Sequence, residues 1–381
     1  MGILSPDNFK KGYSITYAKG ILIVQTFSNG RKVIFMIKTI KDLAEAAHVS
    51  TATVSRALHN SGYVNEETKK LILKLANESN FRPKHYHHKT DSGNELVGII
   101  VADLHNIFFQ EIIAAINDKL YRHHVDTIIC NSDESPQKEI RSISMLHQRN
   151  VNGIIISPIS ETVKYNANYL KELNESGTSV VLVDRDLKGY GIDGVFQDNY
   201  DASTEAVETL IKAGHKDIAI IAGPISSKPG LDRLNAYIDT LSQHQIEIHR
   251  NYIFYGDFKT ESSYQLTKEI LKLPVTAIFC TNNLMALGAI RAIYDAGLSI
   301  PNDISVVSFG SMDSFDLFHD PFITEIQQPT FAMGNESACI MLDKLHRGKK
   351  NRPSNAKRIV FDSELVLRGS EIYPSQTRTI E

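Results

Sequence analysis

The sequence predicts an α/β chain in which a small all-α domain precedes a larger core of two lobes. Between residues 36 and 83, apolar residues recur at helical spacing in short segments that begin with capping residues. From Leu96 onward, short and almost wholly apolar strands alternate with amphipathic helices, which is typical of a parallel sheet covered on both faces. Two successive sets of this alternation predict two α/β lobes with a cleft between them.

The charge of the chain is unevenly distributed. The 381 residues suffice for two or three domains and carry a formal net charge of −3. Residues 1–92 hold 14 Lys and Arg against 7 Asp and Glu, so the remainder has a net charge of −10. A basic N-terminal part followed by an acidic core favours nucleic-acid binding at one end only.

The cysteines and apolar runs indicate the compartment. Cys130, Cys280 and Cys339 lack metal-ligand spacing and lie in apolar segments, so we expect buried thiols in a reducing environment. No apolar run approaches membrane-spanning length, and no signal peptide is evident. We therefore expect a cytoplasmic protein without a membrane partner, and no motif indicates a cofactor or a metal.

Residues 1–35 form a segment of their own. Ile21–Val24 and Val33–Phe35 are apolar runs on either side of the turn dipeptide Asn29–Gly30, which could form a hairpin. We assign this segment no function.

Residues 36–60 predict two short helices joined by a tight turn. Thr39 can cap the first helix and Ser50 the second. The apolar face of the first helix falls at i, i+3, i+4 and i+7: Ile40, Leu43, Ala44 and Ala47. This arrangement fits a helix-turn-helix, whose second helix lies in the DNA major groove.

The second helix carries small and polar side chains on its outward face. Thr51 can donate, accept or touch a thymine methyl, and Arg56 can reach a guanine edge bidentately. A third helix opens near Asn65 and places Lys69 within reach of phosphates. We predict DNA contacts at Thr39, Ser50, Thr51, Ala52, Thr53, Ser55, Arg56, Asn60, Asn65 and Lys69. The alternative is a helical hairpin with an ordinary polar face.

The stretch TIKDLAEAAHVSTATVSRALHNSGYVNEETKKLILKLANESNFRP resembles the DNA-binding head of the lactose/galactose repressor family. The family usually has Gly at the turn, where this chain has His48. That position commonly needs a left-handed backbone, which His tolerates better than most residues, so we expect a strained but intact turn. Family members typically begin near Met36, so the resemblance implies that Met36 is the native start and that residues 1–35 are extra translated sequence.

Residues 84–94, KHYHHKTDSGN, are a polar linker after the head of residues 36–83. In the family this segment folds into a hinge helix on DNA, where a Leu wedges into the minor groove. Thr90 stands at the position of that Leu and His87 at that of an Ala, so the resemblance implies a DNA contact at Thr90 but weaker bending. The linker histidines could add positive charge at acid pH.

The core elements follow in two sets. The first set has the strands LVGIIVAD, DTIICN, NGIIIS and SVVLVD and helices within 108–122, 137–148 and 163–175. The second set has strands DIAIIAG, 252–255, VTAIFCT and DISVVSF and helices within 200–213, 232–242, 261–273 and 284–296. Ligands bind such sheets at the carboxyl ends of the strands.

This region resembles the family's effector-binding core, which is similar to periplasmic sugar-binding proteins. The resemblance rests on DRDLKGYGIDGVFQDNYDAST, GHKDIAIIAGPISSKPGLDRLNAY, TAIFCTNNLMALGAIRAIYDAGLSIPNDISVVSF and PFITEIQQPTFAMG. It implies a periplasmic-binding-protein-like effector and dimerisation domain over residues 95–370. The tail, residues 371–381, lacks the heptads of a tetramerising coiled coil.

Candidate effector-binding residues lie just beyond strands or on loops facing the expected cleft: Asp103, Phe108, Phe109, Asp184, Arg185, Arg233, Phe258 and Asn282. By resemblance, the phenylalanines stack on a ligand ring, and the fork of Arg233 suits a hydroxyl pair or a carboxylate. The structural alternatives are core phenylalanines, an Asp184–Arg185 ion pair and a surface position for Arg233. Gly310 and Ser311 stand where many sugar-binding members carry an Asp, which implies a less acidic cleft suited to a sugar acid or a sugar phosphate.

Together these features predict a homodimeric repressor of carbohydrate-use genes that binds double-stranded operator DNA under control of a sugar-like effector. The alternatives are a sugar-modifying enzyme and a stand-alone sugar-binding protein. The sequence has no nucleophile elbow, phosphate-cradling loop or paired-carboxylate motif, so we predict no enzymatic activity. An export signal, which a transport protein would need, is not evident.

Overall fold

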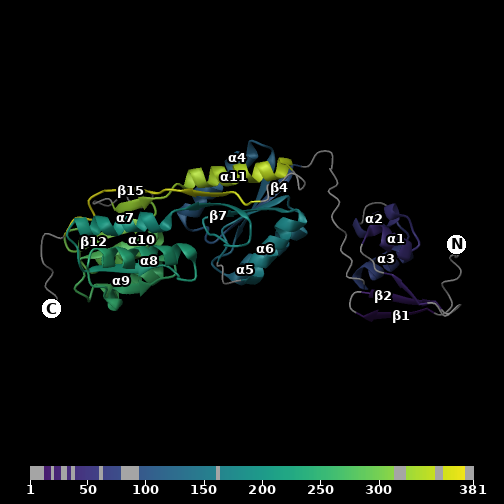
Figure 1. The fold of residues 1–381 in the computed structure, drawn as a ribbon, viewed down its shortest axis with the longest axis horizontal. Helices are drawn as coiled ribbons and strands as arrows, with labels where there is room; N and C mark the ends of the chain where they lie inside the picture. Colours follow the sequence, from purple (N-terminus) through teal and green to yellow (C-terminus); the bar gives the residue numbers. More distant parts are fainter. Residues whose placement is uncertain are drawn as a thin grey trace. The chain divides into compact units, whose positions relative to one another are not determined.

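The computed structural model of the chain describes residues 39–59, 63–78, 94–159, 164–312, 323–347 and 355–373. It also describes the backbone of three strands: β1 (Tyr13–Ala18), β2 (Ile21–Thr26) and β3 (Lys32–Phe35). The chain divides into two compact units, Met1–Ser92 and Gly93–Glu381 (Figure 1).

The three strands of the first unit form an antiparallel sheet in the order β1-β2-β3. The predicted pairing of the second and third strands is confirmed, with Leu22 opposite Phe35. Strand β1 was not predicted, because YSITYA mixes polar and apolar residues without a continuous apolar run. The Asn29–Gly30 turn lies outside the described residues.

Three short helices complete the first unit: α1 (Ile40–Ala46), α2 (Thr51–His59) and α3 (Glu66–Glu78). Leu43, Val54 and Ile72, one from each helix, are fully buried against one another. The predicted caps are confirmed. Thr39 forms a capping box with Asp42, and the Ser50 hydroxyl accepts from the backbone N–H of Thr53 at 3.1 Å. These caps fix where α1 and α2 begin.

The turn between α1 and α2 contains the residue that departs from the family pattern. His48 has φ 53, in the left-handed region. The expected left-handed backbone at this position is therefore confirmed, and His48 adopts it in place of the usual Gly.

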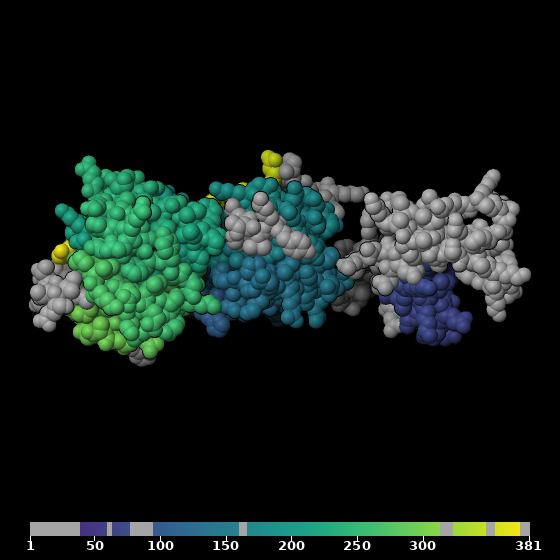
Figure 2. All heavy atoms as spheres, turned by 90° about the horizontal axis from the view of Figure 1, so that it is seen from below, coloured from purple at the N-terminus to yellow at the C-terminus, as the bar shows by residue number. Residues whose placement is uncertain are grey.

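The second unit contains two α/β lobes (Figure 2, with lobe 1 in blue to teal and lobe 2 in green). Lobe 1 has an all-parallel sheet in the order β14-β8-β7-β6-β4-β5. Its strands are β4 (Glu95–Val101), β5 (Val125–Asn131), β6 (Gly153–Ile156), β7 (Ser179–Val183), β8 (Asp193–Gln197) and β14 (Arg358–Phe361). Helices cover both faces: α4 (Ile107–Tyr121), α5 (Pro136–Gln148), α6 (Lys164–Ser176) and α11 (Thr330–Arg347).

Lobe 2 has a sheet in the order β10-β9-β11-β12-β13-β15, in which only β15 is antiparallel to its neighbour. Its strands are β9 (Ile218–Ala222), β10 (Ile253–Tyr255), β11 (Ala277–Cys280), β12 (Ser305–Phe309), β13 (Thr324–Gln327) and β15 (Glu364–Val366). Its covering helices are α7 (Asn199–Lys212), α8 (Lys228–Gln243), α9 (Thr260–Ile270) and α10 (Asn283–Asp295). The predicted fold class is confirmed.

The described chain passes between the lobes at three crossovers. The first lies between β8 and α7, the second between β13 and α11, and the third between β14 and β15. Helix α11 thus returns to lobe 1 and packs on α4, with Met333 and Met341 fully buried. This return was not predicted, because it depends on contacts distant in sequence.

Two sequence-based expectations need correction. Helix α8 begins at Lys228 rather than near Asp232, because Ser227 caps it and Pro229 occupies its first turn. Only Cys280 is a fully buried thiol, while Cys130 and Cys339 are half-buried. Among the described residues no helix is long and apolar enough to cross a membrane.

Candidate DNA-binding face and effector cleft

Helix α2 presents the predicted recognition residues to solvent. Thr51, Ala52 and Arg56 are exposed, and Ser55 is half-buried beside them. On the opposite side, Val54 lies in the three-helix core. The helix is therefore amphipathic, with a small and polar outer face that a groove could accept.

Other predicted DNA contacts have a structural role as well. Thr39, Ser50 and Asn65 cap their helices through side-chain oxygens, and Thr53 bonds to Ser50 at 2.9 Å. All three capping side chains are in exposed surroundings. Lys69 is half-buried on α3. The predicted contacts at Asn60 and Thr90, and the linker histidines, lie outside the described residues.

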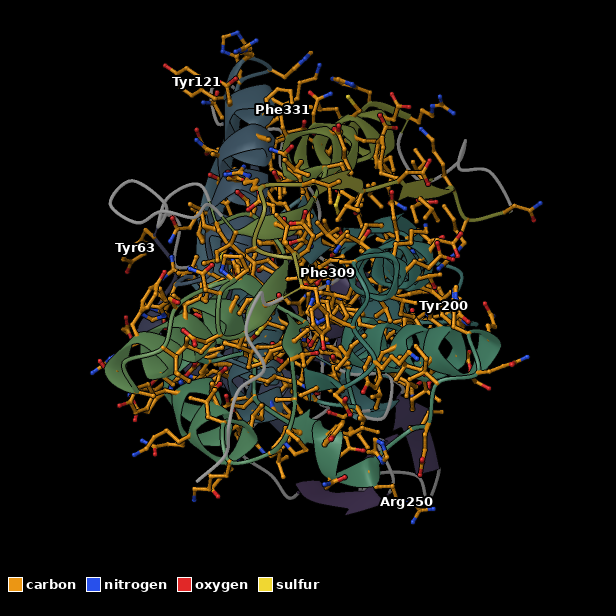
Figure 3. The ribbon with its side chains drawn as sticks, turned by 90° about the vertical axis from the view of Figure 1, so that its left-hand side faces the viewer. Tyr63, Tyr121, Tyr200, Arg250, Phe309 and Phe331 are labelled. Carbon is orange, nitrogen blue, oxygen red and sulfur yellow. The ribbon has the colours of Figure 1, made fainter. Side chains whose placement is uncertain are left out.

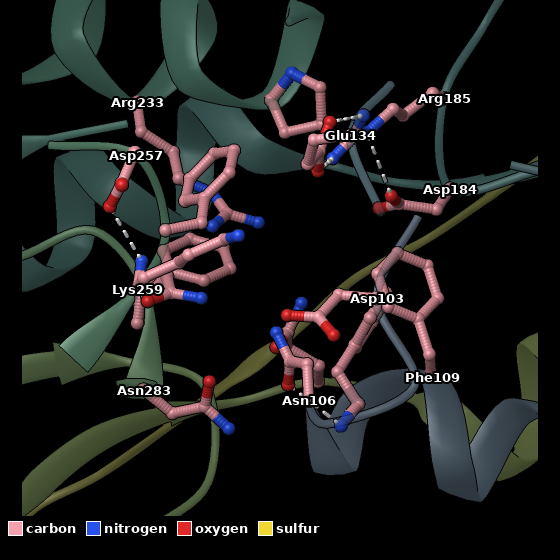
Figure 4. A pocket seen from close by; sticks show the side chains of 16 residues that line it. Asp103, Asn106, Phe109, Glu134, Asp184, Arg185, Arg233, Asp257, Lys259 and Asn283 are labelled. Atoms are coloured by element: carbon pink, nitrogen blue, oxygen red, sulfur yellow. Dashed lines mark hydrogen bonds and ion pairs between the residues drawn. The ribbon is translucent and has the colours of Figure 1, made fainter. Parts of the chain in front are cut away.

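A cleft that is partly open to solvent lies between the two lobes (Figure 4). The structure brings together all eight predicted effector residues in its lining: Asp103, Phe108, Phe109, Asp184, Arg185, Arg233, Phe258 and Asn282. Asp103 follows β4 and Asp184 follows β7, at the carboxyl ends of the two strands that flank β6 in one sheet. Strand ends of both lobes therefore converge on this space, as expected for α/β sheets.

Aromatic rings line both sides of the cleft. Phe108 and Phe109, at the start of α4, meet edge to face with centroids 5.0 Å apart, and Asn106 caps that helix. Lobe 2 contributes Phe258, whose φ is 65, and Phe309. Phe108 and Phe109 are also buried in the lobe 1 core, so they both pack in that core and line the cleft. An apolar ring face would find aromatic surface on both lobes.

Arg185 is held in a buried ion network. Its Nη1 and Nη2 both donate to the carboxylate of Glu134, at 2.8 Å for Nη1, and Nη1 also reaches the carbonyl of Ile159 at 3.2 Å. Its Nε lies 3.6 Å from Asp184 Oδ2. A structural ion pair, the alternative to effector binding, is therefore supported for Arg185, because the Glu134 carboxylate occupies both terminal nitrogens of its guanidinium. Burial raises the pKa of the neighbouring Asp184 carboxyl, although Arg185 opposes that shift.

Arg233 is buried at 5% exposure, so a surface position on its helix is excluded. It donates to Asn199 and to the carbonyl of Thr281, and its guanidinium lies 3.5 Å from the centroid of the Phe309 ring. Among the described residues no carboxylate forms an ion pair with it. Burial lowers its pKa to about 9, which still leaves it protonated at neutral pH.

Asn282 lies at the start of α10, where its Oδ1 caps the helix through the Met285 N–H at 2.8 Å. Several other residues that line the cleft were not predicted from the sequence: Glu134, Pro229, Asp257, Lys259, Asn283, Phe309 and Gln328. Proximity to predicted residues could have indicated Asp257, Lys259 and Asn283, whereas Glu134 had no sequence signal. With Asp103, Glu134, Asp184 and Asp257 against Arg185, Arg233 and Lys259, the cleft is not poor in carboxylates. The expectation that this cleft is less acidic than that of other family members remains a prediction.

Comparison with known proteins assigns both units. Residues 39–84 match the family described as bacterial regulatory proteins, lacI family. Residues 94–361 match the periplasmic binding proteins and sugar binding domain of LacI family. The chain belongs to the LacI family. It therefore combines a helix-turn-helix domain with a periplasmic-binding-protein-like core, as a DNA-binding transcriptional regulator.

Relatives of this LacI-family chain align over most of their length. It is 30% identical over 342 residues to the probable HTH-type transcriptional repressor ExuR of Bacillus subtilis (strain 168), covering 87% of this chain and 98% of that protein. It is 29% identical over 336 residues to the HTH-type transcriptional repressor PurR of Actinobacillus pleuropneumoniae serotype 3 (strain JL03), with the same coverages of 87% and 98%.

Solved structures share the fold. A LacI family transcriptional regulator from Enterococcus faecium with bound ribose aligns with a TM-score of 0.65 and 26% identity, over 74% of this chain and 100% of that one. A transcriptional regulator CelR–cellobiose complex aligns with a TM-score of 0.64 and 24% identity, over 87% and 99% of the two chains.

Within the described residues, no cluster of His, Cys, Asp and Glu could hold a metal ion.

Proposed function

We propose that this LacI-family chain represses carbohydrate-use genes and that a sugar-like effector bound between its lobes controls operator binding. The observation that carries the proposal is the convergence of eight sequence-predicted residues on one cleft. The Enterococcus faecium relative was solved with ribose, which supports a sugar in the equivalent region. A sugar-modifying enzyme has no comparable support, because the relatives above are named as transcription regulators.

The lining favours a neutral, hydroxylated ring over an anion. Phe108 and Phe258 offer apolar faces from opposite lobes, while Asn106, Asn282 and Arg233 offer hydrogen-bonding groups. The cleft carries four carboxylates against three basic groups, and Glu134 already occupies the fork of Arg185, so an unpaired carboxylate or phosphate ligand would meet net repulsion. A sugar acid or sugar phosphate would have to pair with Arg233 or Lys259 to offset that repulsion.

The proposed active form is a homodimer whose two heads read a pseudo-palindromic operator. On the second unit, Tyr121 of α4 and Phe331 of α11 are 75% and 70% exposed (Figure 3). Phe331 borders a hollow lined by Glu111, Ala114 and Asp118 of α4. Large exposed aromatics beside a hollow are typical of interaction sites, which supports pairing through this face.

A DNA-binding titration tests the proposal. Duplex DNA from upstream of the chain's own coding region would be titrated with full-length protein by fluorescence anisotropy at 50 and 200 mM salt. We expect tight binding that weakens steeply with salt, because phosphate contacts release counterions. Cellobiose, D-ribose, D-glucuronate, D-glucose 6-phosphate and hypoxanthine would then be added singly. A change in affinity with cellobiose or ribose supports the proposal, and a response to hypoxanthine alone would replace the sugar by a purine.

A further inference from the structure

Arg233 uses part of its hydrogen-bonding capacity within the protein. Its Nε and Nη2 donate to the single oxygen Oδ1 of Asn199, at 2.9 and 2.7 Å. Its Nη1 donates to the carbonyl of Thr281, and the Phe309 ring lies against the guanidinium. Of the five N–H groups of an arginine, one on each terminal nitrogen is left for a ligand. The plane of the guanidinium is therefore set before any effector arrives.

Asn199 is suited to this task by burial and by charge. Its side chain is 5% exposed, and its Nδ2 donates to the carbonyl of Gln197 at 3.3 Å, so both ends of the amide have partners. Because the amide is neutral, it orients Arg233 without neutralising its positive charge. A carboxylate here would form an ion pair and reduce the charge that the cleft presents. The amide thus keeps Arg233 both fixed and cationic.

Asn199 also lies where the chain passes from lobe 1 to lobe 2. It is the first residue of α7, and one residue, Asp198, separates it from β8. The neighbouring Asp198 N–H donates to the carbonyl of Phe361 at 3.0 Å, which joins this first crossover to the third crossover. Backbone dihedral angles at crossovers must change when lobes reorient. A side chain anchored here and on Arg233 therefore connects the cleft to this crossover.

We infer that Asn199 is a positioning residue, which holds Arg233 toward the effector and couples effector binding to the first crossover between the lobes. The inference rests on the proposed function, because it requires Arg233 to contact the effector. Asn199 itself acts only through Arg233.

Two measurements on full-length protein test this role. The exchange rate of the Arg233 Nε–H, assigned in ¹⁵N-arginine spectra with Arg233→Lys, reports positioning without any ligand. Calorimetric titration with cellobiose, D-ribose, D-glucuronate and D-glucose 6-phosphate reports effector binding. The variants are Asn199→Ala, which removes the acceptor, and Asn199→Asp, which keeps it. Asn166→Ala is the matched control, because Asn166 is equally buried at 4% exposure but bonds to Glu139 and the carbonyl of Pro136.

We expect Asn199→Ala to speed Nε–H exchange at least tenfold and to weaken binding of the responding compound about tenfold, the loss typical of a hydrogen bond to a charged group. Asn199→Asp should restore slow exchange, and Asn166→Ala should change neither quantity. Wild-type exchange or wild-type affinity in Asn199→Ala would overturn the inference. If none of the four compounds binds the wild type, the proposed sugar effector fails, while Nε–H exchange still decides the role of Asn199. Asn199→Ser, whose hydroxyl is too short to reach Arg233, replaces the alanine variant if that one does not fold.

Discussion

Asp133 of lobe 1 and Lys259 of lobe 2 form an ion pair between the lobes, with Nζ 3.5 Å from Oδ1. Both lie beside cleft-lining residues, Glu134 and Phe258, that have left-handed backbones with φ of 52 and 65. Asp133 also pairs with Lys138 at 2.7 Å, so its carboxylate is shared between a contact within lobe 1 and one between the lobes. Strained residues often cluster where function requires a defined geometry. The pair holds the two lobes together on the side of the cleft where these loops meet.

Removing this pair should let the two lobes separate more readily at the cleft. In Lys259→Met we expect faster amide hydrogen exchange in residues 131–135 and 256–260, and about two- to fivefold weaker binding of any responding sugar. The effect is small because both side chains are partly exposed, and exposed pairs contribute about 0.2–1 kcal/mol. Lys272→Met is the control, since Lys272 pairs with Glu269 inside lobe 2. Unchanged exchange in both segments would show that the pair does not restrain the lobes.

The turn of the helix-turn-helix offers a test of backbone strain. Because the backbone of His48 is in the left-handed region, a β-branched residue at this position should be destabilising. We expect His48→Val to lower the free energy of unfolding by about 1–2 kcal/mol. His48→Gly should fold at least as well as the wild type, since Gly adopts this conformation freely. Urea unfolding followed by circular dichroism, with DNA binding measured in parallel, would check both. His124→Val, at φ 58 in lobe 1, should destabilise the core without affecting DNA affinity.

The cleft could be predicted because the carboxyl ends of apolar strands can be recognised in the sequence. Asp103 and Asp184 each follow an apolar strand, and parallel strands end at the same edge of a sheet. The left-handed turn at His48 and the caps at Thr39 and Ser50 are likewise local properties. Local spacing and capping chemistry therefore sufficed to locate these features.

Features that depend on contacts between distant segments could not be predicted. Glu134 enters the cleft through its bidentate pair with Arg185, 51 residues away in sequence. The return of α11 to lobe 1 depends on packing against α4, which no local pattern encodes.

Substitutions on α2 and α3 should distinguish a residue that reads a base from one that contacts the phosphate backbone. Arg56→Ala should relax specificity at one base pair of each half-site, because a bidentate guanine contact contributes about 1–3 kcal/mol of discrimination. Lys69→Ala should weaken binding to all sequences alike and reduce the salt slope by about one. Anisotropy titrations with operator variants at two salt concentrations measure both effects. A uniform loss in Arg56→Ala would mean that Arg56 contacts phosphate instead.

Acid should destabilise the second unit through His215. This imidazole is fully buried, with Nδ1 2.8 Å from the Thr276 hydroxyl and Nε2 3.1 Å from the carbonyl of Glu371, and Tyr373 packs on its ring. Burial lowers its pKa from 6.5 to about 4. The unfolded chain therefore takes up a proton at higher pH than the folded one does. The resulting stability is fully present above pH 6.5 and is lost as the pH falls toward 4, by roughly 3 kcal/mol at most.

Replacing the imidazole should remove that pH dependence. His215→Gln can keep one hydrogen bond but cannot be protonated, so its urea midpoint should fall less between pH 7 and pH 5 than that of the wild type. His244→Gln controls for imidazole removal at an exposed site, since His244 lies at the C-terminal end of α8. Parallel pH profiles for the wild type and His215→Gln would count against the assignment. Carboxylate protonation, which is common to all three proteins, would then explain the whole of the acid effect.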